Sequence, residues 1–444
     1  MFEVSRHDAD LLAEAFLAGV RLRGLEPGSM LAFSCANSPS LLAAVFGCLR
    51  SGLAPVVLSA SLTQSERDDM LRDLPIELVV DDRLLSALRA GTSRPGDAPA
   101  MGESFRCRPL HFTSGTSGRP KAVWSGWVAE EQARASADDE QSAWSFDAAD
   151  RHLVNAPLSH SAPLRFALNT LLHGGTAIVP PRFDVDTASE LVATAGVTTT
   201  FMAPVHLQRL LTQAPPATHT LRLLAHAGSA CPTRVKQHAV DLFGAPVVTE
   251  FYGSTEGQFT VCSTAEWAAH PGTVGRARPG RRLEIVDGQI WCEAPPHARF
   301  EYWGDPEKTA AAWDGAWFTV GDLGRLDAEG YLYLEGRRSD LIVTGGVNVY
   351  PAEVERVLGE VRGVDKVCVV GVEDPEWGRR VCAVLTGDVT EQTVREYAAA
   401  HLAPYKRPKT VLIVDELPLT HSGKIDRTRV ADALEGPPGS VHGP

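Results

Sequence analysis

The chain has 444 residues, of which 44% are hydrophobic and 22% are charged, as in ordinary globular proteins. This composition excludes a disordered or fibrous chain, and the length allows two or three domains. The 55 acidic residues outnumber the 42 basic ones and leave a net charge of −13, which argues against nucleic acid or an anionic membrane as a partner.

The eight cysteines are scattered, and none forms a Cys-x-x-Cys pair. This spacing gives no support to a zinc site and is typical of reduced, buried thiols. The first ten residues carry acids rather than the basic and apolar regions of a signal peptide. The longest apolar stretches are far shorter than the roughly 20 residues that cross a bilayer. We therefore expect a soluble protein of the cytoplasm.

Helices and strands alternate along the first 200 residues. Apolar residues at helical spacing predict helices over 8–23, 40–51 and near 188–195. Short apolar runs predict strands over 30–35, 54–58, 78–80, 109–112, 176–179 and 198–201. Such alternation favours a parallel α/β sheet over an all-α or all-β fold.

After residue 272 the pattern changes to short strands and tight turns. Asp287-Gly288 between two apolar runs predicts a hairpin. The strands expected in this part cover 283–286, 290–292 and 331–334. Farther on, a helix over 351–358 and strands over 366–372 and 381–385 predict a compact C-terminal domain. We place the boundary at 337–340, which gives domains of residues 1–336 and 337–444.

The most informative motif is the run Phe112-Thr-Ser-Gly-Thr-Ser-Gly-Arg-Pro-Lys121. Its glycines leave backbone N–H groups open to phosphate oxygens, and its hydroxyls add further donors. Lys121 adds a positive charge. The run lacks the Gly-Lys-Ser/Thr ending of a P-loop, so alone it indicates either another phosphate-binding loop or a flexible surface loop.

Three further segments combine glycine, hydroxyl and charged residues. Glu250-Phe-Tyr-Gly-Ser-Thr-Glu-Gly257 follows an apolar strand, and its Glu256 and Thr255 suit a magnesium ion and a phosphate. Asp322 suits ribose hydroxyls, and Lys424 lies on a Ser-Gly turn near the C-terminus. Taken alone, each segment also fits an ordinary turn.

Together, in this order, the four segments resemble those of the adenylate-forming superfamily, which contains acyl- and aryl-CoA ligases, luciferases and the adenylation domains of peptide synthetases. A fifth segment, Ala156-Pro-Leu-Ser-His160, is similar to the Pro-Leu-x-His segment of the family, and the resemblance extends from about residue 24 to residue 427. It implies an α/β fold. A large N-terminal domain of stacked α/β sheets with a small β-rich subdomain would precede a small, mobile α+β C-terminal domain.

The resemblance implies a nucleotide site. The residues that match the ATP- or AMP-binding positions of the family are Thr113, Ser114, Gly115, Thr116, Ser117, Gly118, Lys121, Gly228, Ser229, Ala230, Tyr252, Gly253, Asp322 and Arg337. The loop that ends at Lys121 would hold the β- and γ-phosphates. Tyr252 would stack on adenine, and Asp322 would hold the ribose hydroxyls with help from Arg337.

The resemblance also assigns catalytic positions. These are Lys424, Glu256, Thr255 and His160. Lys424 would bridge the substrate carboxylate and the α-phosphate, Thr255 would contact that phosphate, and Glu256 would bind magnesium. The C-terminal domain would then rotate, and Gly345-Gly346 would form part of the passage for pantetheine. Ser339 stands at the hinge, where the family often has Asp or Lys, and we expect the rotation to survive this difference.

The acyl pocket is expected to be mostly apolar. Its candidate residues are His160, Leu164, Arg165, Phe166, Phe201, Met202, His226 and Ala227. No acidic residue follows His160 at the place where peptide synthetases bind an α-amino group, so we expect an aryl or a short- to medium-chain acid instead. Arg165 would either pair with a second carboxylate of the substrate or extend to the surface.

The sequence thus predicts an ATP- and magnesium-dependent carboxylate–CoA ligase that forms acyl-AMP, releases pyrophosphate and transfers the acyl group to CoA. It would work as a monomer or homodimer, without nucleic acid or membrane. Two alternatives stay open. One is an adenylating enzyme that loads a carrier-protein pantetheine or an amine, and the other is a non-catalytic nucleotide-binding module.

Overall fold

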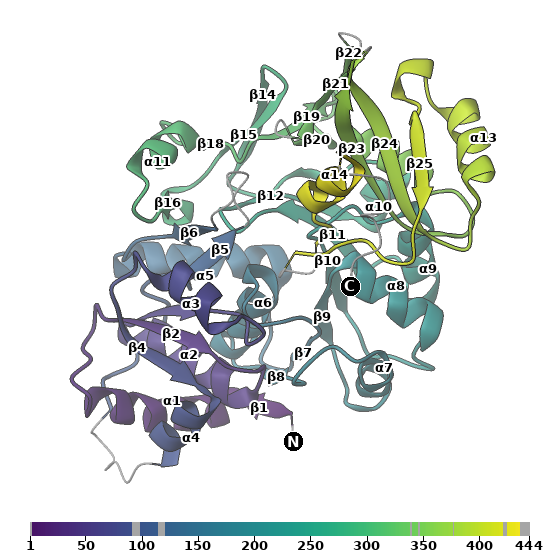
Figure 1. Ribbon diagram of the computed structural model, residues 1–444. Coiled ribbons are helices and arrows are strands. Elements are labelled where there is room, and N and C mark those ends of the chain that lie inside the picture. Colours follow the sequence, from purple (N-terminus) through teal and green to yellow (C-terminus); the bar gives the residue numbers. More distant parts are fainter. Residues whose placement is uncertain are drawn as a thin grey trace. The chain divides into compact units, whose positions relative to one another are not determined.

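The computed structural model describes residues 2–90, 98–113, 120–337, 340–344, 347–375, 377–420 and 424–435 (Figure 1). The chain separates into two compact units. The first comprises Met1–Ser229, His238–Leu283 and Cys292–Phe318, and the second comprises Ala230–Gln237, Glu284–Trp291 and Thr319–Pro444. This division assigns the stretch 319–336 to the second unit. The predicted boundary at 337–340 stays a prediction, and Ser339 lies outside the described residues.

An eight-stranded sheet forms the centre of the first unit. Its strands, in spatial order, are β1 (Glu3–Ser5), β8 (Thr176–Ile178), β7 (Arg151–Val154), β9 (Thr199–Met202), β10 (Leu223–His226), β11 (Val248–Gly253), β12 (Gln258–Ser263) and β13 (Arg276–Ala277). The five strands from β8 to β11 are parallel, whereas β1, β12 and β13 are antiparallel to their neighbours. The predicted parallel α/β sheet is therefore confirmed.

A second, three-stranded parallel sheet has the order β3-β2-β4, with β3 (Ala54–Val57), β2 (Met30–Ser34) and β4 (Ile76–Asp81). Helices α1 (Arg6–Arg21), α2 (Pro39–Ser51), α3 (Gln64–Leu71) and α4 (Asp82–Ala90) accompany it. One hydrophobic core continues from this sheet to the large one, because α6 (Ser161–Leu172) packs on β7 and β9 and also contacts α2. The stacked arrangement follows the expected fold class.

Local capping explains where the first helices begin. Ser5 and Asp8 form a capping box, so α1 starts two residues before the predicted position. Ser38 caps α2 ahead of Pro39, and Gly52, with φ of 81°, ends that helix. Gly47 lets α2 approach α1 closely, since a Cβ at this position would lie 2.7 Å from the Cβ of Ala13.

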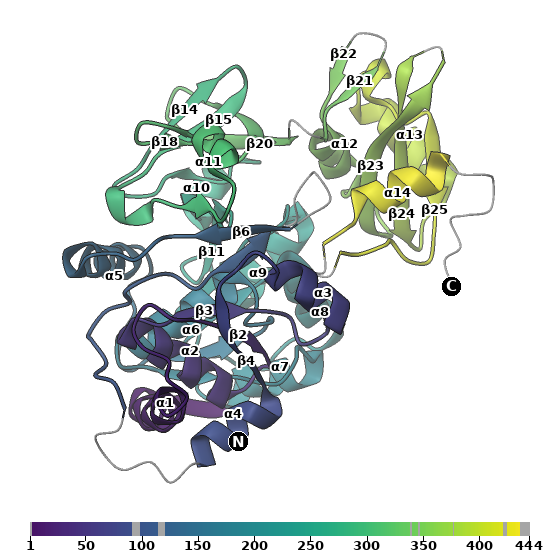
Figure 2. The ribbon, with the colours of Figure 1, turned by 60° about the vertical axis from the view of Figure 1, so that its left-hand side comes forward.

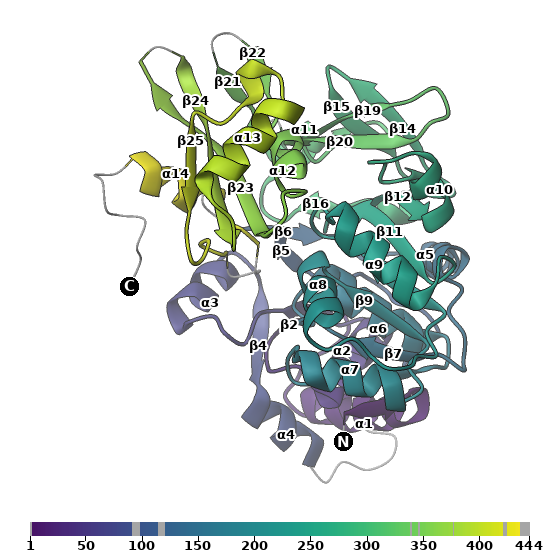
Figure 3. The ribbon, with the colours of Figure 1, turned by 90° about the vertical axis from the view of Figure 1, so that its right-hand side faces the viewer.

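The remaining helices of the large sheet are α5 (Glu130–Trp144), α7 (Val185–Thr194), α8 (Pro204–Gln213), α9 (Thr233–Phe243) and α10 (Thr264–Ala269). Figure 3 shows α7 and α8 together beside β9. A small sheet of order β16-β6-β5 completes this part, with β16 (Glu301–Tyr302), β6 (Lys121–Trp124) and β5 (His111–Thr113). The 3₁₀ helix η1 (Pro296–Ala298) and α11 (Pro306–Ala312) flank β16.

The predicted β-rich stretch after residue 272 consists of short antiparallel strands. They are β14 (Arg282–Val286), β15 (Gln289–Glu293), β17 (Trp313–Asp314), β18 (Trp317–Phe318), β19 (Asp322–Leu326) and β20 (Leu332–Arg337). Asp287 and Gly288 join β14 to β15 with φ of 50° and 78°, as a two-residue hairpin turn of type I′ requires. The predicted hairpin is confirmed.

A five-stranded sheet with β22-β21-β24-β23 as its main order and β25 paired to β24 occupies the C-terminal part (Figure 2). Its strands are β21 (Ile342–Thr344), β22 (Val347–Val349), β23 (Val364–Asp374), β24 (Gly378–Gly387) and β25 (Thr410–Ile413). Its helices are α12 (Pro351–Leu358), α13 (Glu391–His401), η3 (Pro404–Lys406) and α14 (Arg427–Glu435).

Alternation along β23 builds two separate cores. Val369 points to the side covered by α12 and α13, whereas Cys368 and Val370 belong to the core that includes Val430 of α14. The predicted helix and strands of this domain are all present, with strand ends that differ by no more than three residues. None of the described helices combines the length and the hydrophobicity needed to cross a membrane.

A buried ion network anchors α5 to the residues that follow β13 (Arg276–Ala277) and to η1. Asp139 accepts hydrogen bonds from Arg281 at 2.8 and 3.1 Å, and His297 Nε2 lies 3.2 Å from its Oδ2 atom. Arg278, whose side chain is fully buried, lies 3.3 Å from Asp139 and 3.2 Å from Glu140. Burial alone would raise the pKa of Asp139, but the hydrogen bonds from His297 and Arg281 and the charges of Arg278 and Arg281 outweigh it, so the pKa is lowered.

We expect Asp139→Asn to destabilise the protein by about 3 kcal/mol at pH 7, because it removes the carboxylate that pairs with the buried Arg281. Asp138→Asn is the matched control, since Asp138 is the exposed neighbour on the same helix. Because the pKa of Asp139 is lowered on folding, its contribution is complete above the ordinary value of 3.8 and is lost as the pH falls toward the lowered value. Denaturant unfolding at pH 7 and at acidic pH measures both effects, and equal stability of the two variants at pH 7 would contradict the prediction.

Candidate functional site

Strands β5 and β6 hold the two ends of the phosphate-loop motif beside each other. Their antiparallel register places Thr113 opposite Lys121 and Phe112 opposite Ala122. The loop residues Ser114, Gly115, Thr116, Ser117 and Gly118 lie outside the described residues. The described part of the motif is therefore its base, where the hydroxyl of Thr113 and the ammonium group of Lys121 belong to facing residues.

Tyr302 connects Lys121 with Glu256. It lies in β16, opposite Val123 of β6, and the Lys121 ammonium nitrogen is 5.0 Å from the centroid of its ring. The Tyr302 hydroxyl donates a hydrogen bond of 3.1 Å to Oε1 of Glu256, whose side chain is buried. The acidic residue predicted to bind magnesium and the lysine predicted to bind phosphate thus contact the same tyrosine.

A tight turn between β11 and β12 fixes the position of Glu256. The N–H of Ser254 donates to the carbonyl of Gly257 at 2.8 Å, and Arg108 donates to the carbonyl of Glu256 at 3.4 Å. Gly257 has no room for a side chain, because a Cβ would lie 2.5 Å from the ring of Phe318. Burial lowers the pKa of Arg108 to about 10, so this side chain still carries its charge at neutral pH.

The predicted nucleotide-binding residues of β10 and β11 gather at one edge of the large sheet. The parallel register aligns Met202, His226 and Glu250, so Gly228 and Tyr252 both follow at the carboxyl ends of neighbouring strands. Ser229, Ala230, Gly253 and Thr255 lie in the same two segments. The carboxyl edge of a parallel sheet is where α/β proteins bind ligands.

An aromatic cluster covers one face of the sheet beside these strands. Phe201 and Ala227, both predicted pocket residues, pack with Trp144, Phe166 and Phe251, and neighbouring ring centroids are 4.9–6.2 Å apart. His226 is fully buried in β10. Leu164 is also fully buried, but it belongs to the larger core that includes α1 and α2.

Arg165 does not extend to the surface, which was one of its two expected orientations. Its guanidinium carbon lies 5.4 Å from the ring centroids of both Phe166 and Phe251, and its Nε atom is 3.6 Å from Oε2 of Glu140. Burial lowers the pKa of Arg165 to about 10 although Glu140 opposes the shift. The two ring faces and the internal carboxylate hold the side chain inward.

Two residues that sequence analysis missed hold the segment around His160. Asn37 donates to the carbonyl of Ala156 at 3.0 Å and accepts from the N–H of Leu158 at 2.9 Å. Nδ1 of His111, in β5, lies 3.1 Å from the carbonyl of Ser159, and burial lowers the pKa of His111 to about 4. Because a carbonyl only accepts, Nδ1 carries the proton of this neutral imidazole.

In the second unit, Asp322 and Arg337 are register partners on β19 and β20. Asp322 is buried at 8% exposure. Lys424 is exposed, and its backbone carbonyl accepts from the N–H of Thr420 at 2.7 Å. The predicted pantetheine passage, Gly345-Gly346, lies outside the described residues between β21 and β22.

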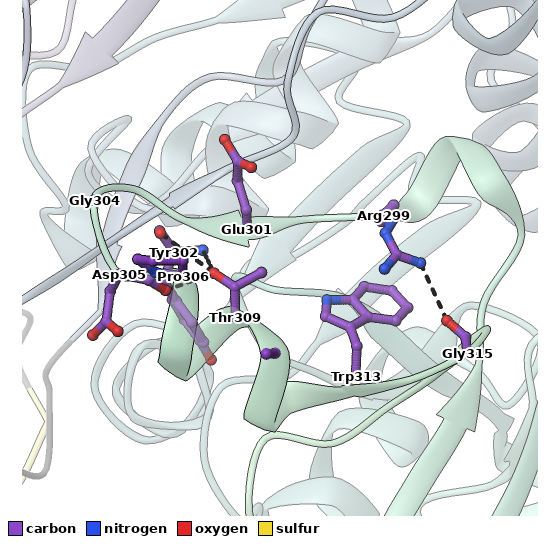
Figure 4. A pocket seen from close by; sticks show the side chains of 10 residues that line it. Arg299, Glu301, Tyr302, Gly304, Asp305, Pro306, Thr309, Trp313 and Gly315 are labelled. Atoms are coloured by element: carbon purple, nitrogen blue, oxygen red, sulfur yellow. Dashed lines mark hydrogen bonds between the residues drawn. The ribbon is translucent and has the colours of Figure 1, made fainter.

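An open pocket of about 480 Å³ adjoins Tyr302 (Figure 4). It lies between β16, α11 and β17, and its lining includes Arg299, Thr309 and Trp313. The Arg299 guanidinium lies 4.5 Å from the Trp313 ring and donates to the carbonyl of Gly315 at 3.2 Å. Tyr302 thereby contributes one side to this pocket and its hydroxyl to Glu256.

The carboxylate of Glu256, near the phosphate-loop motif, suits a magnesium ion rather than a zinc ion. Within the described ranges no three His, Cys, Asp or Glu side chains gather as a metal site. A single buried carboxylate such as Glu256 fits magnesium, which takes one or two protein carboxylates and completes its shell with water and phosphate oxygens.

Comparison with known families gives two matches in chain order. Residues 3–298 match the family model described as "AMP-binding enzyme", and residues 353–424 match the one described as "AMP-binding enzyme C-terminal domain". Together the two models cover most of the chain.

Individual relatives match along almost their whole length. The chain is 31% identical to an indoleacetate–CoA ligase of Aromatoleum aromaticum, over 94% of this chain and 91% of that protein. It is 29% identical to a fatty acid–[acyl-carrier-protein] ligase of Streptomyces coeruleorubidus, over 98% and 92%. A solved structure of o-succinylbenzoate CoA synthetase from Bacillus subtilis, in complex with an acyl-adenylate intermediate, superposes with a TM-score of 0.86 at 25% identity and covers 97% of this chain and 94% of its own.

Tyr302→Phe is expected to weaken magnesium-dependent ATP binding about 10-fold, because it removes a hydrogen bond that orients Glu256. Tyr333→Phe is the matched control. Its hydroxyl also donates to a carboxylate at 3.1 Å, that of Asp327. Calorimetric titration of ATP with and without magnesium measures the effect. If the Tyr302→Phe variant bound ATP as tightly as the wild type in the presence of magnesium, the assignment of Glu256 as a magnesium ligand would be contradicted.

Proposed function

The chain belongs to the AMP-binding enzyme family, and from this premise we propose that it is an AMP-forming acid–CoA ligase. The observation that carries the proposal is the contact of Lys121 and Glu256 with one tyrosine beside the base of the phosphate loop. This grouping puts a cation and a magnesium-suited carboxylate together, as a triphosphate site requires.

The proposed reaction has two steps. An oxygen of the substrate carboxylate attacks the α-phosphorus of ATP, the bond to the β-phosphate oxygen breaks, and pyrophosphate leaves. The thiolate of CoA then attacks the acyl carbonyl carbon, and AMP leaves with the electron pair of its phosphate oxygen. Both products of the first step are retained or released as anions, so positive charge must be present around the phosphates throughout.

The charged residues divide this task. The first step brings two anions together, and fixed positive charge aimed at the transition state is usually the largest catalytic contribution. We assign this role to Lys121 and Arg337, with Lys424 between the carboxylate and the α-phosphate. A magnesium ion held by Glu256 supplies further charge when bound. Thr255 donates to the α-phosphate, whereas His160 borders the acyl group.

The remaining assignments concern the nucleotide and the acceptor. Tyr252 stacks on adenine, flanked by Gly253 and by the segment 228–230. Asp322 accepts from the ribose hydroxyls, and the loop 113–118 surrounds the β- and γ-phosphates. Gly345-Gly346 lines the path of the pantetheine thiol.

We infer that the substrate is an aryl monocarboxylic acid. The predicted pocket residues Phe201 and Ala227 belong to an aromatic cluster with Phe251, and aromatic surroundings favour a planar group. Arg165 already faces Glu140, so its charge has an internal counter-ion and a second substrate carboxylate would have to compete with it. The relative from Aromatoleum aromaticum, by its name, acts on indoleacetate, which is an acid of this class.

The two enzymatic alternatives differ in the molecule that accepts the acyl group, which is CoA in one and a carrier protein or an amine in the other. Most of the support comes from relatives named as CoA ligases, but the Streptomyces relative is named for an acyl-carrier-protein acceptor. A carrier protein presents the same pantetheine thiol as CoA, so both acceptors fit the same second step. CoA is our primary proposal.

We expect pyrophosphate release from ATP and magnesium to depend on the acid supplied, with aryl monocarboxylates favoured at least about 10-fold over dicarboxylates because Arg165 is already paired. The panel contains aryl, aliphatic and dicarboxylic acids, each tested with and without CoA. Repeated turnover only with CoA supports the ligase. Turnover with phosphopantetheinylated carrier protein but not with CoA would make the carrier protein the acceptor in place of CoA. If the protein bound ATP but released no pyrophosphate with any acid, the non-catalytic module would be favoured.

Lys424→Ala is expected to slow pyrophosphate release about 10²–10³-fold, because it removes a positioned charge from the first transition state. Formation of the thioester from synthetic acyl-AMP and CoA is expected to change far less, since that step starts after the phosphoryl chemistry. Lys409→Ala, which removes an ammonium group that lies over Trp377, is the control for loss of charge in the same domain. Equal slowing of both steps by Lys424→Ala would contradict the assigned role.

A further inference from the structure

Arg427 joins the turn that carries Lys424 to three other parts of the C-terminal domain. It is the first residue of α14, and its Nη1 and Nη2 atoms donate to the two carboxylate oxygens of Glu355 in α12 at 2.5 and 2.7 Å. Nη1 also donates to the carbonyl of Val369 in β23 at 2.8 Å, and Nε lies 3.4 Å from Oδ2 of Asp340. Two parallel bonds to one carboxylate fix the plane of the guanidinium as well as its distance.

The Arg427–Glu355 pair is fixed by backbone groups as well as by its own charges. Within the described sheet, β23 lies at the edge, with β24 as its partner. The N–H of Val369 donates to Oε1 of Glu355 at 2.7 Å, while its carbonyl accepts from Arg427. The pair therefore satisfies both backbone groups of an edge residue, which an exposed pair of flexible side chains does not do.

Hydrogen bonds also fix the backbone between Lys424 and this pair. Two bonds join Thr420 and Lys424, at 2.7 and 3.3 Å, and the N–H of Asp426 donates to the carbonyl of Pro418 at 2.9 Å. The carboxylate of Asp426 accepts from the N–H of Arg429 at 3.1 Å and so caps α14. Lys424 comes two residues before Asp426, so its backbone is oriented where the chain enters this helix, which is where Arg427 lies.

We propose that Arg427 is a positioning residue for Lys424, acting through Glu355 and Val369, and that Asp340 extends this link to the beginning of the C-terminal domain. The inference rests on the proposed role of Lys424 in the first step. The backbone that carries the exposed lysine is held in place by the partly buried charges of Arg427 and Glu355 and by the edge strand β23.

The test compares the two steps in Glu355→Gln and in Arg427→Lys. Glutamine keeps the shape of Glu355 but loses its charge, and lysine keeps the charge of Arg427 but loses the fork. We expect both variants to slow pyrophosphate release about 10- to 100-fold, since a displacement of about 1 Å of a reacting group has an effect of this size. Thioester formation from synthetic acyl-AMP and CoA is expected to stay within about threefold of wild type.

A matched control is available on the same helix. Glu353 of α12 accepts two hydrogen bonds from Lys406, at 2.5 and 2.7 Å, but this pair has no bond to residues 418–420 or 424–426 among the described contacts. Glu353→Gln removes a carboxylate of the same kind two residues away and is expected to leave both steps within about twofold of wild type. Thermal unfolding of each variant shows whether the domain has kept its fold.

Combining substitutions separates positioning from general damage. If Arg427 acts through Lys424, adding Glu355→Gln to Lys424→Ala slows pyrophosphate release no further than Lys424→Ala alone. Independent, multiplying losses would overturn the inference, as would equal slowing of both steps in Arg427→Lys or no slowing in either single variant. Absence of any pyrophosphate release by the wild type would instead contradict the proposed function, so the two failures are distinguishable.

Discussion

The hydrogen bond between Tyr302 and Glu256 connects the two segments of the chain on which the candidate site depends. Tyr302 reaches Glu256 because β16 pairs with β6, and β6 in turn pairs with β5 and ends the phosphate loop. A short antiparallel sheet thus connects the two strands that flank the loop with the acidic turn after β11. Gly257 is part of the same constraint, since a Cβ there would overlap the ring of Phe318.

Charge balance beneath the site follows from the position of Gln258, which comes directly after that turn. Its amide donates to Glu140 at 2.7 Å and accepts from Arg278. Burial alone would raise the pKa of Glu140, but the charges of Arg165 and Arg278 and the Gln258 bond lower it instead. Because unpaired charges are costly in such surroundings, the acidic turn, α5 and the guanidinium of Arg165 must stay together. One network thereby supports both the proposed magnesium ligand and the inner wall of the proposed acyl pocket.

The sequence was most informative where a structural cause is local. Ser5, Ser38 and Gly52 mark helix ends through bonds within a few residues, and Asp287-Gly288 forms a turn that needs no distant partner. The order of the glycine-rich and acidic segments also predicted the family. This prediction is confirmed by two matches that together extend from residue 3 to residue 424.

Partners that are distant in the sequence could not be predicted in the same way. Tyr302 reaches Glu256 only through the register of β16, and Glu140 meets Arg165 only because α5 lies beside α6. Arg165 illustrates the consequence, since surface exposure was a reasonable expectation until its internal carboxylate was known. Neither Glu140 nor His111 lies in a motif, and both are typical of ordinary helix or strand positions when the neighbouring element is unknown.

The C-terminal domain shows why a rigid base suits an exposed catalytic lysine. A lysine side chain gives up as much as about 2 kcal/mol of conformational free energy when it is immobilised, and backbone that must be ordered at the same time adds about 1–2 kcal/mol per residue. Lys424 is already bonded to Thr420, and Asp426 to Pro418, while Arg427 joins the chain after them to α12 and β23. The two hydrophobic cores on the two faces of β23 also contribute to this rigidity. A strand packed on both faces holds the backbone carbonyl that Arg427 binds in a fixed position.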